Sequence, residues 1–169
     1  MSQDNPSPDE QFATRSREYG VAIREVSPGS VAETIDDAID PPAVGVELPW
    51  EDVELPASVR TVPTAGDLKN AATGVTAASL AVAEYGSIVL RADREGSEPL
   101  SLFNDHHIAV LRREDIVPDM TAAFEWFGSE IRETGDSAIL ATGPSATADM
   151  GALVQGAHGP KAVTVVVVS

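Results

Sequence analysis

The sequence predicts one α/β domain with a largely parallel sheet flanked by helices. Segments with the composition of strands alternate with segments of helical spacing along the 169 residues, which is typical of parallel-sheet proteins. The last segment, 162–168, is β-branched almost throughout and has no polar alternation, as expected for a strand buried on both faces. We expect residues 19–169 to form the domain and the polar, proline-containing residues 1–18 to form a flexible acidic tail.

The first half of the domain is expected to begin with a helix at Ser30. Ser30 and Glu33 have the spacing of a capping box, in which each side chain bonds the backbone N–H of the other residue. Pro41 and Pro42 end this helix, because proline cannot continue it. Two short strands and an alanine-rich second helix follow, at 44–48, 59–62 and 73–84.

The second half contains two further predicted helices. In the first, which starts near Pro118, an apolar stripe of helical period is expected to face the core, and Trp126 lies off that stripe as a candidate for a partner surface. The stripe consists of Met120, Phe124, Phe127 and Ile131. The other helix is expected at 145–154. The predicted strands of this half are 87–91, 108–111, 137–142 and 162–168.

The charge of the chain limits its partners. Twenty-seven acidic residues face eleven basic ones, for a net charge of −16, and such a surface repels the phosphate backbone of nucleic acids. Self-repulsion of this size destabilises a compact domain at low salt and is screened at molar salt. Lysine occurs only at positions 69 and 161. The composition therefore predicts a protein adapted to high salt.

The sequence also predicts a cytoplasmic protein without redox groups of its own. Residues 1–10 are polar and acidic, unlike a signal peptide, and no apolar run is long enough for a membrane span. The chain has no cysteine, so it cannot hold an iron–sulfur cluster or zinc through thiolates.

The segments 141–149 and 156–160 carry the most distinctive pattern in the chain. They read ATGPSATAD and GAHGP, and place two glycine–proline turns, hydroxyls, a carboxylate and a histidine between two predicted strands. If Ser145 or Thr147 caps a helix here, the free N–H groups of that helix favour a carboxylate or phosphate. Alternatively, Ser145 only caps the helix and Asp149 only compensates its dipole.

Four further residues are candidates for chemistry. His158, between two glycines, could act as a general acid or base, or bond a turn carbonyl. Glu84 could be a base, a nucleophile or a solvated charge. His106 and His107 are adjacent on a predicted strand and should point to opposite faces, so no metal site is expected. No Rossmann, Walker or hydrolase-elbow motif is present in the sequence.

Four segments together resemble LUD-domain proteins of the lactate-utilization protein C (LutC) type. TGPSATAD at 142–149 and GAHGP at 156–160 resemble the C-terminal signature of that family, and AEYGSIVL at 83–90 and LSLFNDHHI at 100–108 resemble two upstream elements. The resemblance implies a fold similar to the NagB/RpiA/CoA-transferase-like domains. It also implies a role in oxidising L-lactate to pyruvate, in a complex whose partner proteins carry the iron–sulfur clusters.

The resemblance assigns roles to the matched positions. It makes Glu84, His158 and Asp149 the candidate catalytic residues and implies no metal or cofactor bound by this chain. The implied ligand-binding residues are Gly86, His107, Thr142, Gly143, Pro144, Ser145, Thr147, Gly156 and Gly159. The sequence departs from the family pattern at Tyr85, Ala146 and Gly151.

Two alternatives stay open at this point. The first is a stand-alone enzyme of the CoA-transferase or sugar-phosphate isomerase kind with Glu84 as nucleophile or base, which rests on the glutamate–glycine corner and on fold analogy. The second is a regulatory module that binds a small carboxylate without catalysis.

Overall fold

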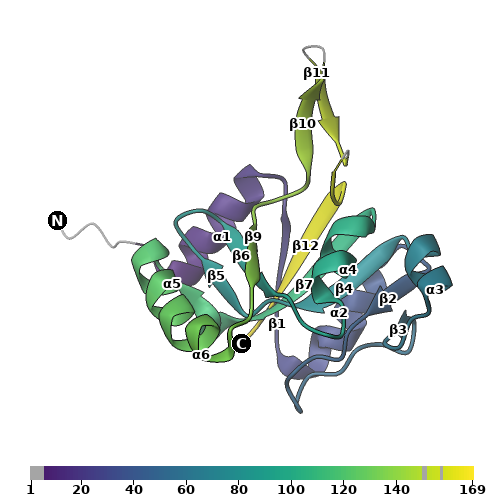
Figure 1. The fold of residues 1–169 in the computed structure, drawn as a ribbon, viewed down its shortest axis with the longest axis horizontal. Coiled ribbons are helices and arrows are strands. Elements are labelled where there is room, and N and C mark those ends of the chain that lie inside the picture. Colours follow the sequence, from purple (N-terminus) through teal and green to yellow (C-terminus); the bar gives the residue numbers. More distant parts are fainter. Residues whose placement is uncertain (1–5, 150–151, 157) are drawn as a thin grey trace.

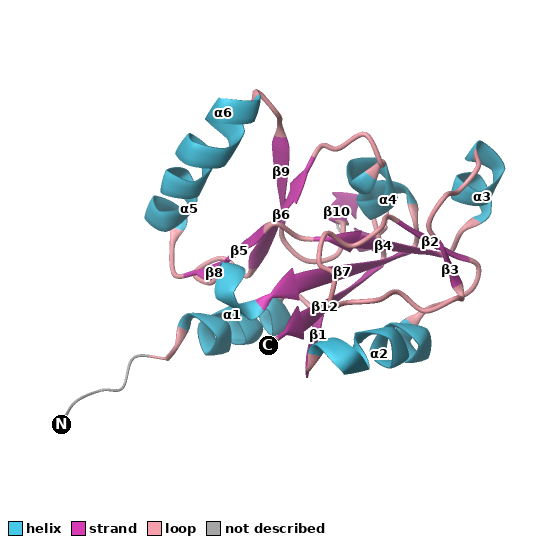
Figure 2. Ribbon diagram, turned by 90° about the horizontal axis from the view of Figure 1, so that it is seen from below, coloured by secondary structure: helices cyan, strands magenta, loops and turns pink. Residues whose placement is uncertain are grey.

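A six-stranded, entirely parallel sheet forms the centre of the protein. The computed structural model describes residues 6–149, 152–156 and 158–169 (Figures 1 and 2). The strand order is β1-β12-β7-β4-β2-β3. These strands are β1 (Ala22–Val26), β2 (Ala43–Gly45), β3 (Val59–Arg60), β4 (Thr73–Ala77), β7 (His106–Arg112) and β12 (Ala162–Val168). The predicted fold class is confirmed.

The valine-rich strand β12 lies inside this sheet, between β1 and β7. Successive side chains of a strand point to opposite faces, so Val163, Val165 and Val167 enter one apolar cluster, and Val166 and Val168 enter another on the opposite face. Both faces of β12 are therefore buried. This explains why polar and apolar residues do not alternate along the strand.

The two faces of the sheet are covered differently. Helix α2 (Val31–Ala38) packs on one face through Val31 and Ile35. The opposite face carries α1 (Pro8–Glu18) and a second sheet of order β8-β5-β6-β9, whose Ile88 and Leu90 join the same cluster as Val163. The strands of this second sheet are β5 (Leu80–Val82), β6 (Ser87–Arg91), β8 (Ile116–Val117) and β9 (Ala138–Ala141).

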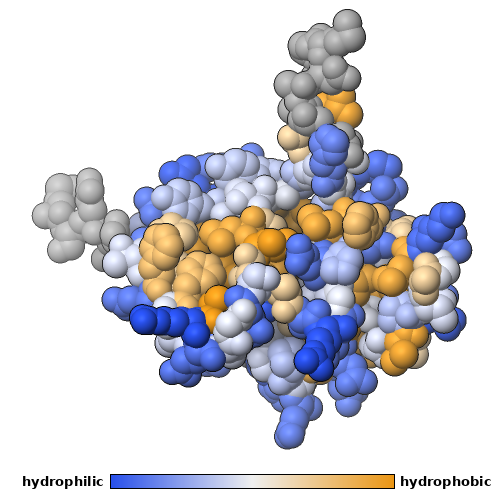
Figure 3. Space-filling model, viewed as in Figure 1, coloured by the Kyte–Doolittle hydropathy of each residue, from blue (hydrophilic) through white to orange (hydrophobic). Residues whose placement is uncertain are grey.

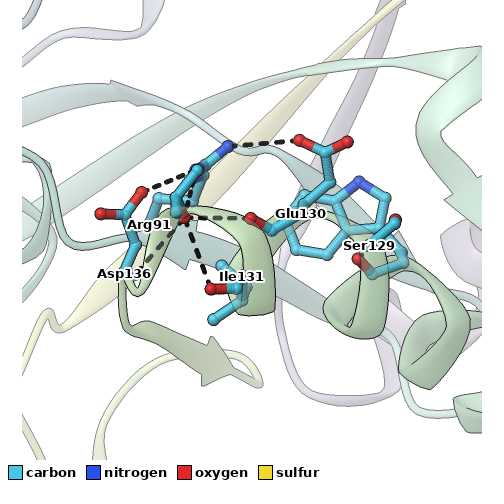
Figure 4. A network of polar contacts seen from close by, with 7 residues as sticks. Arg91, Ser129, Glu130, Ile131 and Asp136 are labelled. Atoms are coloured by element: carbon cyan, nitrogen blue, oxygen red, sulfur yellow. Dashed lines mark hydrogen bonds and ion pairs between the residues drawn. The ribbon is translucent and has the colours of Figure 1, made fainter.

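The remaining helices are short and lie at the periphery. They are α3 (Ala65–Asn70), α4 (Ser97–Phe103), α5 (Met120–Trp126), a π-helical turn (Phe127–Ile131) and α6 (Arg132–Thr134). Arg91, at the end of β6, donates to Asp136 at 2.7 Å and lies 3.8 Å from Glu130, which joins the second sheet to the helical connection before β9 (Figure 4). None of the helices in the described ranges is long and apolar enough to cross a membrane.

The expected tail at 1–18 is wrong for its second part. Residues 8–18 form α1, with Pro8 in the first turn and a capping box between Ser7 and Glu10. Phe12 is 1% exposed and packs between α1 and the sheet. The signal for this helix was in the sequence, because serine followed three residues later by glutamate is the capping-box spacing.

The predicted helix at 73–84 is two strands, β4 and β5. Gly74 shows why tertiary packing overrides the helix propensity of the alanines. A Cβ on Gly74 would lie 2.3 Å from the carbonyl oxygen of Leu100, so α4 rests directly on the β4 backbone. The alanines at 78, 81 and 83 are fully buried, and their small size suits this tight packing.

The predicted helix at 145–154 is also wrong. This segment forms an antiparallel hairpin, β10 (Ala146–Asp149) with β11 (Ala152–Gln155), which projects from the body as an arm (Figure 1). The Gly156 N–H donates to the Ser145 carbonyl at 2.8 Å and closes the base of the arm. A ten-residue helix would separate its ends by about 15 Å, so this closure excludes it.

The apolar stripe expected after Pro118 faces inward only in part. Met120 and Phe127 pack on the second sheet, but Phe124 is 66% exposed. Trp126, expected on a partner surface, packs on that sheet instead and meets Phe127 edge-to-face at 5.4 Å. The fully buried Ala123 sets the inward face, and Trp126 follows it three residues later on the same side.

Candidate functional site

The largest concentration of predicted site residues lines one cavity of about 460 Å³. It lies where β1, β7 and β12 begin and where β9 ends, beneath the base of the arm. The cavity is thus at the amino edge of the parallel strands, whereas open α/β sheets usually bind ligands at the carboxyl edge. Its volume is that of a small-molecule site.

His107 forms part of the cavity wall near the start of β7. Its side chain is nearly fully buried, and Nε2 lies 2.8 Å from the Thr76 hydroxyl on β4. Burial, with a smaller contribution from His106, lowers the pKa of His107 to about 3. The imidazole is therefore neutral at physiological pH.

His106 points to the other face of the sheet, as expected for adjacent strand residues. Its Nε2 lies 2.9 Å from the Thr164 hydroxyl, and its Nδ1 lies 3.9 Å from an Asp40 carboxylate oxygen. Burial lowers the pKa of His106, and the Asp40 charge opposes that shift. Within the described ranges, no group of three histidine or acidic side chains is arranged to hold a metal ion.

The two glycine–proline turns of the sequence are bonded to each other. The Ser145 N–H donates to the Pro160 carbonyl at 2.8 Å, and the Ser145 carbonyl accepts from Gly156. Gly143 has a φ of +67°, and a Cβ there would lie 2.8 Å from the Tyr19 Cβ. The end of α1 therefore packs closely on the first turn. This contact requires glycine both for its backbone angle and for its lack of a side chain.

Asp105 anchors the second turn to the start of β7. Its carbonyl accepts from the N–H groups of Lys161 and Ala162, and its carboxylate lies 2.9 Å from the Lys161 ammonium. These contacts position the Gly156–Pro160 loop beside His107. The other side of the cavity is fixed by a 2.6 Å hydrogen bond between the hydroxyls of Ser87 and Thr142, which joins the start of β6 to the end of β9.

The charge of the cavity differs from that of the whole chain. Among the lining residues that the structure describes, none is aspartate or glutamate, although the chain has twenty-seven acids. Two imidazoles and the hydroxyls of Ser101, Thr142 and Ser145 line it instead. An anionic ligand would therefore meet hydrogen-bonding groups without like-charge repulsion.

Comparison with known proteins identifies the family. The model of the LUD domain family matches residues 64–168, which hold most of the cavity lining. The chain belongs to the LUD domain family. It is 34% identical over 168 residues to "Lactate utilization protein C" of Deinococcus radiodurans, an alignment that covers 94% of this chain and 78% of that protein.

Another relative of this LUD-domain protein is matched over less of its length, and one solved structure over its whole length. The protein of the same name from Oceanobacillus iheyensis is 33% identical over 104 residues, which cover 59% of this chain and 45% of that protein. The crystal structure of a DUF162 family protein from Deinococcus radiodurans superposes with a TM-score of 0.74 at 26% identity, covering 98% of this chain and 100% of that one.

Eight of the twelve predicted site residues line the cavity of the LUD domain. They are Gly86, His107, Thr142, Gly143, Pro144, Ser145, His158 and Gly159. Gly156 is not among the lining residues and instead closes the base of the arm, where its φ is +76°. The side chains of Thr147 and Asp149, and the whole of Gly151, lie outside the described part of the chain, so their predicted roles stay predictions.

Glu84 lies apart from the cavity. It is exposed on the turn between β5 and β6, and its N–H donates to the Pro118 carbonyl. Gly86, two residues later, lines the cavity. Its φ is +63°, and a Cβ there would lie 2.7 Å from the Ser16 nitrogen of α1.

The sequence reasoning missed two groups of cavity residues. Tyr19 and Val21, at the start of the predicted domain, were left without a role, and recognising the helix capped by Ser7 would have placed them beside the site. The apolar wall was missed because its members read only as core residues of strands. They are Ile88, Ile139, Val163 and Val165.

Proposed function

We propose that this LUD-domain protein takes part in the use of L-lactate, as a subunit of a cytoplasmic complex that oxidises L-lactate to pyruvate. In this proposal the cavity binds a small carboxylate, and partner proteins supply the iron–sulfur clusters. The support is the family, the relatives named "Lactate utilization protein C", and the absence of cysteine from the sequence.

The observation that carries the proposal is the cavity built by the family's own motifs, whose described lining contains no acidic side chain. The segments 142–146 and 158–160, which carry the C-terminal signature, meet His107 and Gly86 from the two upstream elements around one volume. A carboxylate there can accept hydrogen bonds from hydroxyl and imidazole donors, and such bonds to a charged group are the stronger kind. The neutral His107, fixed by Thr76, can orient a ligand oxygen without a charge of its own.

The geometry gives no support to the CoA-transferase alternative. That reaction needs the Glu84 carboxylate at the bound substrate, and Glu84 is exposed on a turn that does not line the cavity. Incubation with acyl-CoAs followed by hydroxylamine trapping is expected to yield no glutamyl adduct. An adduct that disappears in Glu84→Gln would favour this alternative.

Genetic complementation tests the proposed function. Deleting the gene in its native host is expected to abolish growth on L-lactate, and the wild-type gene is expected to restore it. The double variant His107→Gln/Ser145→Ala should fail to restore growth although the protein accumulates. Phe103→Ala, at an 82% exposed position outside the cavity lining, should restore growth fully and serves as the matched control.

Affinity purification tests the complex separately. Tagged protein isolated from native cells in molar salt is expected to carry cysteine-rich iron–sulfur proteins with it. Normal growth of the deletion strain on L-lactate would contradict the role. Loss of growth without any co-purifying iron–sulfur protein, together with tight carboxylate binding, would point to the regulatory module instead.

A further inference from the structure

The cavity is larger than a three-carbon acid requires. A water molecule occupies about 30 Å³ of the liquid, so a volume of about 460 Å³ has room for a ligand with on the order of fifteen non-hydrogen atoms. L-lactate or pyruvate would fill less than half of it. The remaining space calls for a larger ligand, and its lining indicates which chemistry that ligand has.

Three of the polar groups of the cavity lie together at one end, whereas His107 stands further along β7. Thr142 and Ser145 lie on the first glycine–proline turn, and His158 lies on the loop before β12, bonded to that turn through Pro160. All three are partly or fully exposed. This end is therefore the mouth of the cavity and the place for a hydrated, charged group.

The wall of the cavity between the two sheets is apolar. Val163 is the register partner of His107, so its side chain stands beside the imidazole, and Val165 continues the same face one step further along β12. Ile88 and Ile139 contribute to this wall from β6 and β9 of the second sheet. Val165 is 1% exposed and Ile88 3%, so these two side chains are packed in the core and close the inner end of the cavity.

An apolar surface also borders the mouth. Leu102 of α4 lines the cavity and is 37% exposed. In the space-filling view, apolar side chains extend across this face over β9 and α4, below the arm (Figure 3). A hydrocarbon chain that displaces water from such walls binds favourably, and each methylene that it buries raises the affinity of the ligand about fourfold.

From these observations we infer that the cavity binds monocarboxylates with an extended apolar tail, held with the carboxylate at the Thr142–Ser145 turn and the tail along the accessible apolar side chains of Ile139 and Leu102. Within the proposed function, on which this inference rests, the ligand is a 2-hydroxy acid or 2-oxo acid with a longer hydrocarbon chain than lactate.

A homologous ligand series tests the inference. Isothermal titration in molar KCl would compare L-lactate with straight-chain 2-hydroxy acids of four, six and eight carbons. The dissociation constant is expected to fall about fourfold with each added methylene until the cavity is filled. A dissociation constant that stays constant from three to eight carbons would overturn the inference. Primary alcohols of the same lengths should bind at least tenfold more weakly, and equal binding would overturn the role of the carboxylate.

Two cavity variants and one control locate the tail. Ile139→Phe, at a partly buried position of the apolar wall, should remove the gain for the eight-carbon acid and leave L-lactate binding within twofold. If that variant does not fold, Leu102→Ala should weaken the eight-carbon acid several-fold and spare L-lactate. Phe103→Ala, the exposed neighbour outside the lining, should change neither. An unchanged chain-length dependence in the folded cavity variants would overturn the placement of the tail.

The outcomes separate this inference from the proposed function. Loss of growth on L-lactate upon gene deletion, combined with equal affinity along the series, would retain the function and overturn the inference. A steep chain-length dependence with unaffected growth on L-lactate would retain the inference and overturn the proposed function. The first readout is growth and the second is affinity of the purified protein, so neither depends on the other.

Discussion

The Nε2 atom of His107 lies 2.8 Å from the hydroxyl of Thr76, on the neighbouring parallel strand. The bond holds the one fully buried imidazole of the cavity in a fixed orientation while burial keeps it uncharged. The neutral, oriented imidazole can form a hydrogen bond with an oxygen of a carboxylate ligand. No described residue of the cavity lining carries a negative charge that would repel this ligand. Substitution of His107 should therefore change both the free energy of unfolding and the affinity for the ligand.

The first expected outcome concerns pH and His107. Its folded-state pKa of about 3 lies below the unfolded value of about 6.5. As pH falls, the unfolded chain therefore takes up the proton first, and unfolding becomes favoured. The stability that the neutral, buried His107 contributes to the fold is fully present above about pH 6.5 and is lost as pH falls toward 3. The difference in unfolding free energy between the wild type and His107→Gln should shrink by about 2 kcal/mol between pH 7 and pH 5. Urea denaturation at both pH values measures it, and a constant difference would contradict the buried, neutral state.

The second expected outcome concerns Gly86. Its positive φ alone makes alanine unfavourable by about 1 kcal/mol, and the 2.7 Å approach to the Ser16 nitrogen adds a steric conflict with α1. Gly86→Ala should therefore lower the unfolding free energy by about 2–4 kcal/mol. Gly135→Ala is the matched control, because Gly135 has a φ of +71° and nothing within 4 Å of its Cβ position. Equal losses in the two variants would show that the α1 contact is not formed.

The third expected outcome concerns Phe12. Because this side chain is 1% exposed in the cluster between α1 and the two sheets, Phe12→Ala should destabilise the protein by about 3–5 kcal/mol. Phe103→Ala, at an 82% exposed position, should change stability by less than about 0.5 kcal/mol. Guanidinium denaturation in high salt compares them. A small effect of Phe12→Ala would restore the interpretation of residues 8–18 as a loose tail.

The fourth expected outcome concerns salt. With a net charge of −16, the folded chain repels itself, and the Debye length falls from about 10 Å at 0.1 M to about 3 Å at 1 M salt. The melting temperature should rise as KCl is increased from 0.1 to 2 M. Glycine betaine at equal osmolality, which does not screen charge, is the control and should produce a smaller rise. A melting temperature that falls with KCl would contradict adaptation to high salt.

The fold class and several elements follow from the sequence because their causes are local. The β-branched run of β12, the helix that begins after Ser30 and its end before Pro41–Pro42 each depend on residues within one or two turns of chain. The capping box predicted between Ser30 and Glu33 is wrong, because the Ser30 side chain makes no cap hydrogen bond. The family motifs behave similarly, since short segments with fixed spacing identify the LUD domain before any contact is known. These features need no knowledge of what lies across the core.

The misassigned segments depend on distant residues. Segment 73–84 has the alanine content of a helix, but Gly74 lies under the Leu100 carbonyl, and β4 pairs with strands that begin at positions 43 and 106. Segment 145–154 has local helical periodicity, but Ser145 is bonded to Gly156 and Pro160, which brings the two ends of the segment together. Both segments are decided by long-range backbone contacts that local propensity does not contain.

The candidate site also combines features that follow from the sequence with features that depend on tertiary packing. The sequence by itself determined which residues carry the chemistry: the two glycine–proline turns, the paired histidines and the family to which they belong. Only the tertiary structure decided that His107 faces the cavity while His106 faces Thr164, that Glu84 stands outside, and that an apolar wall of strand residues completes the site. The physical reason is that residue chemistry is a local property, whereas burial, register and the space between two sheets arise only when distant segments pack together.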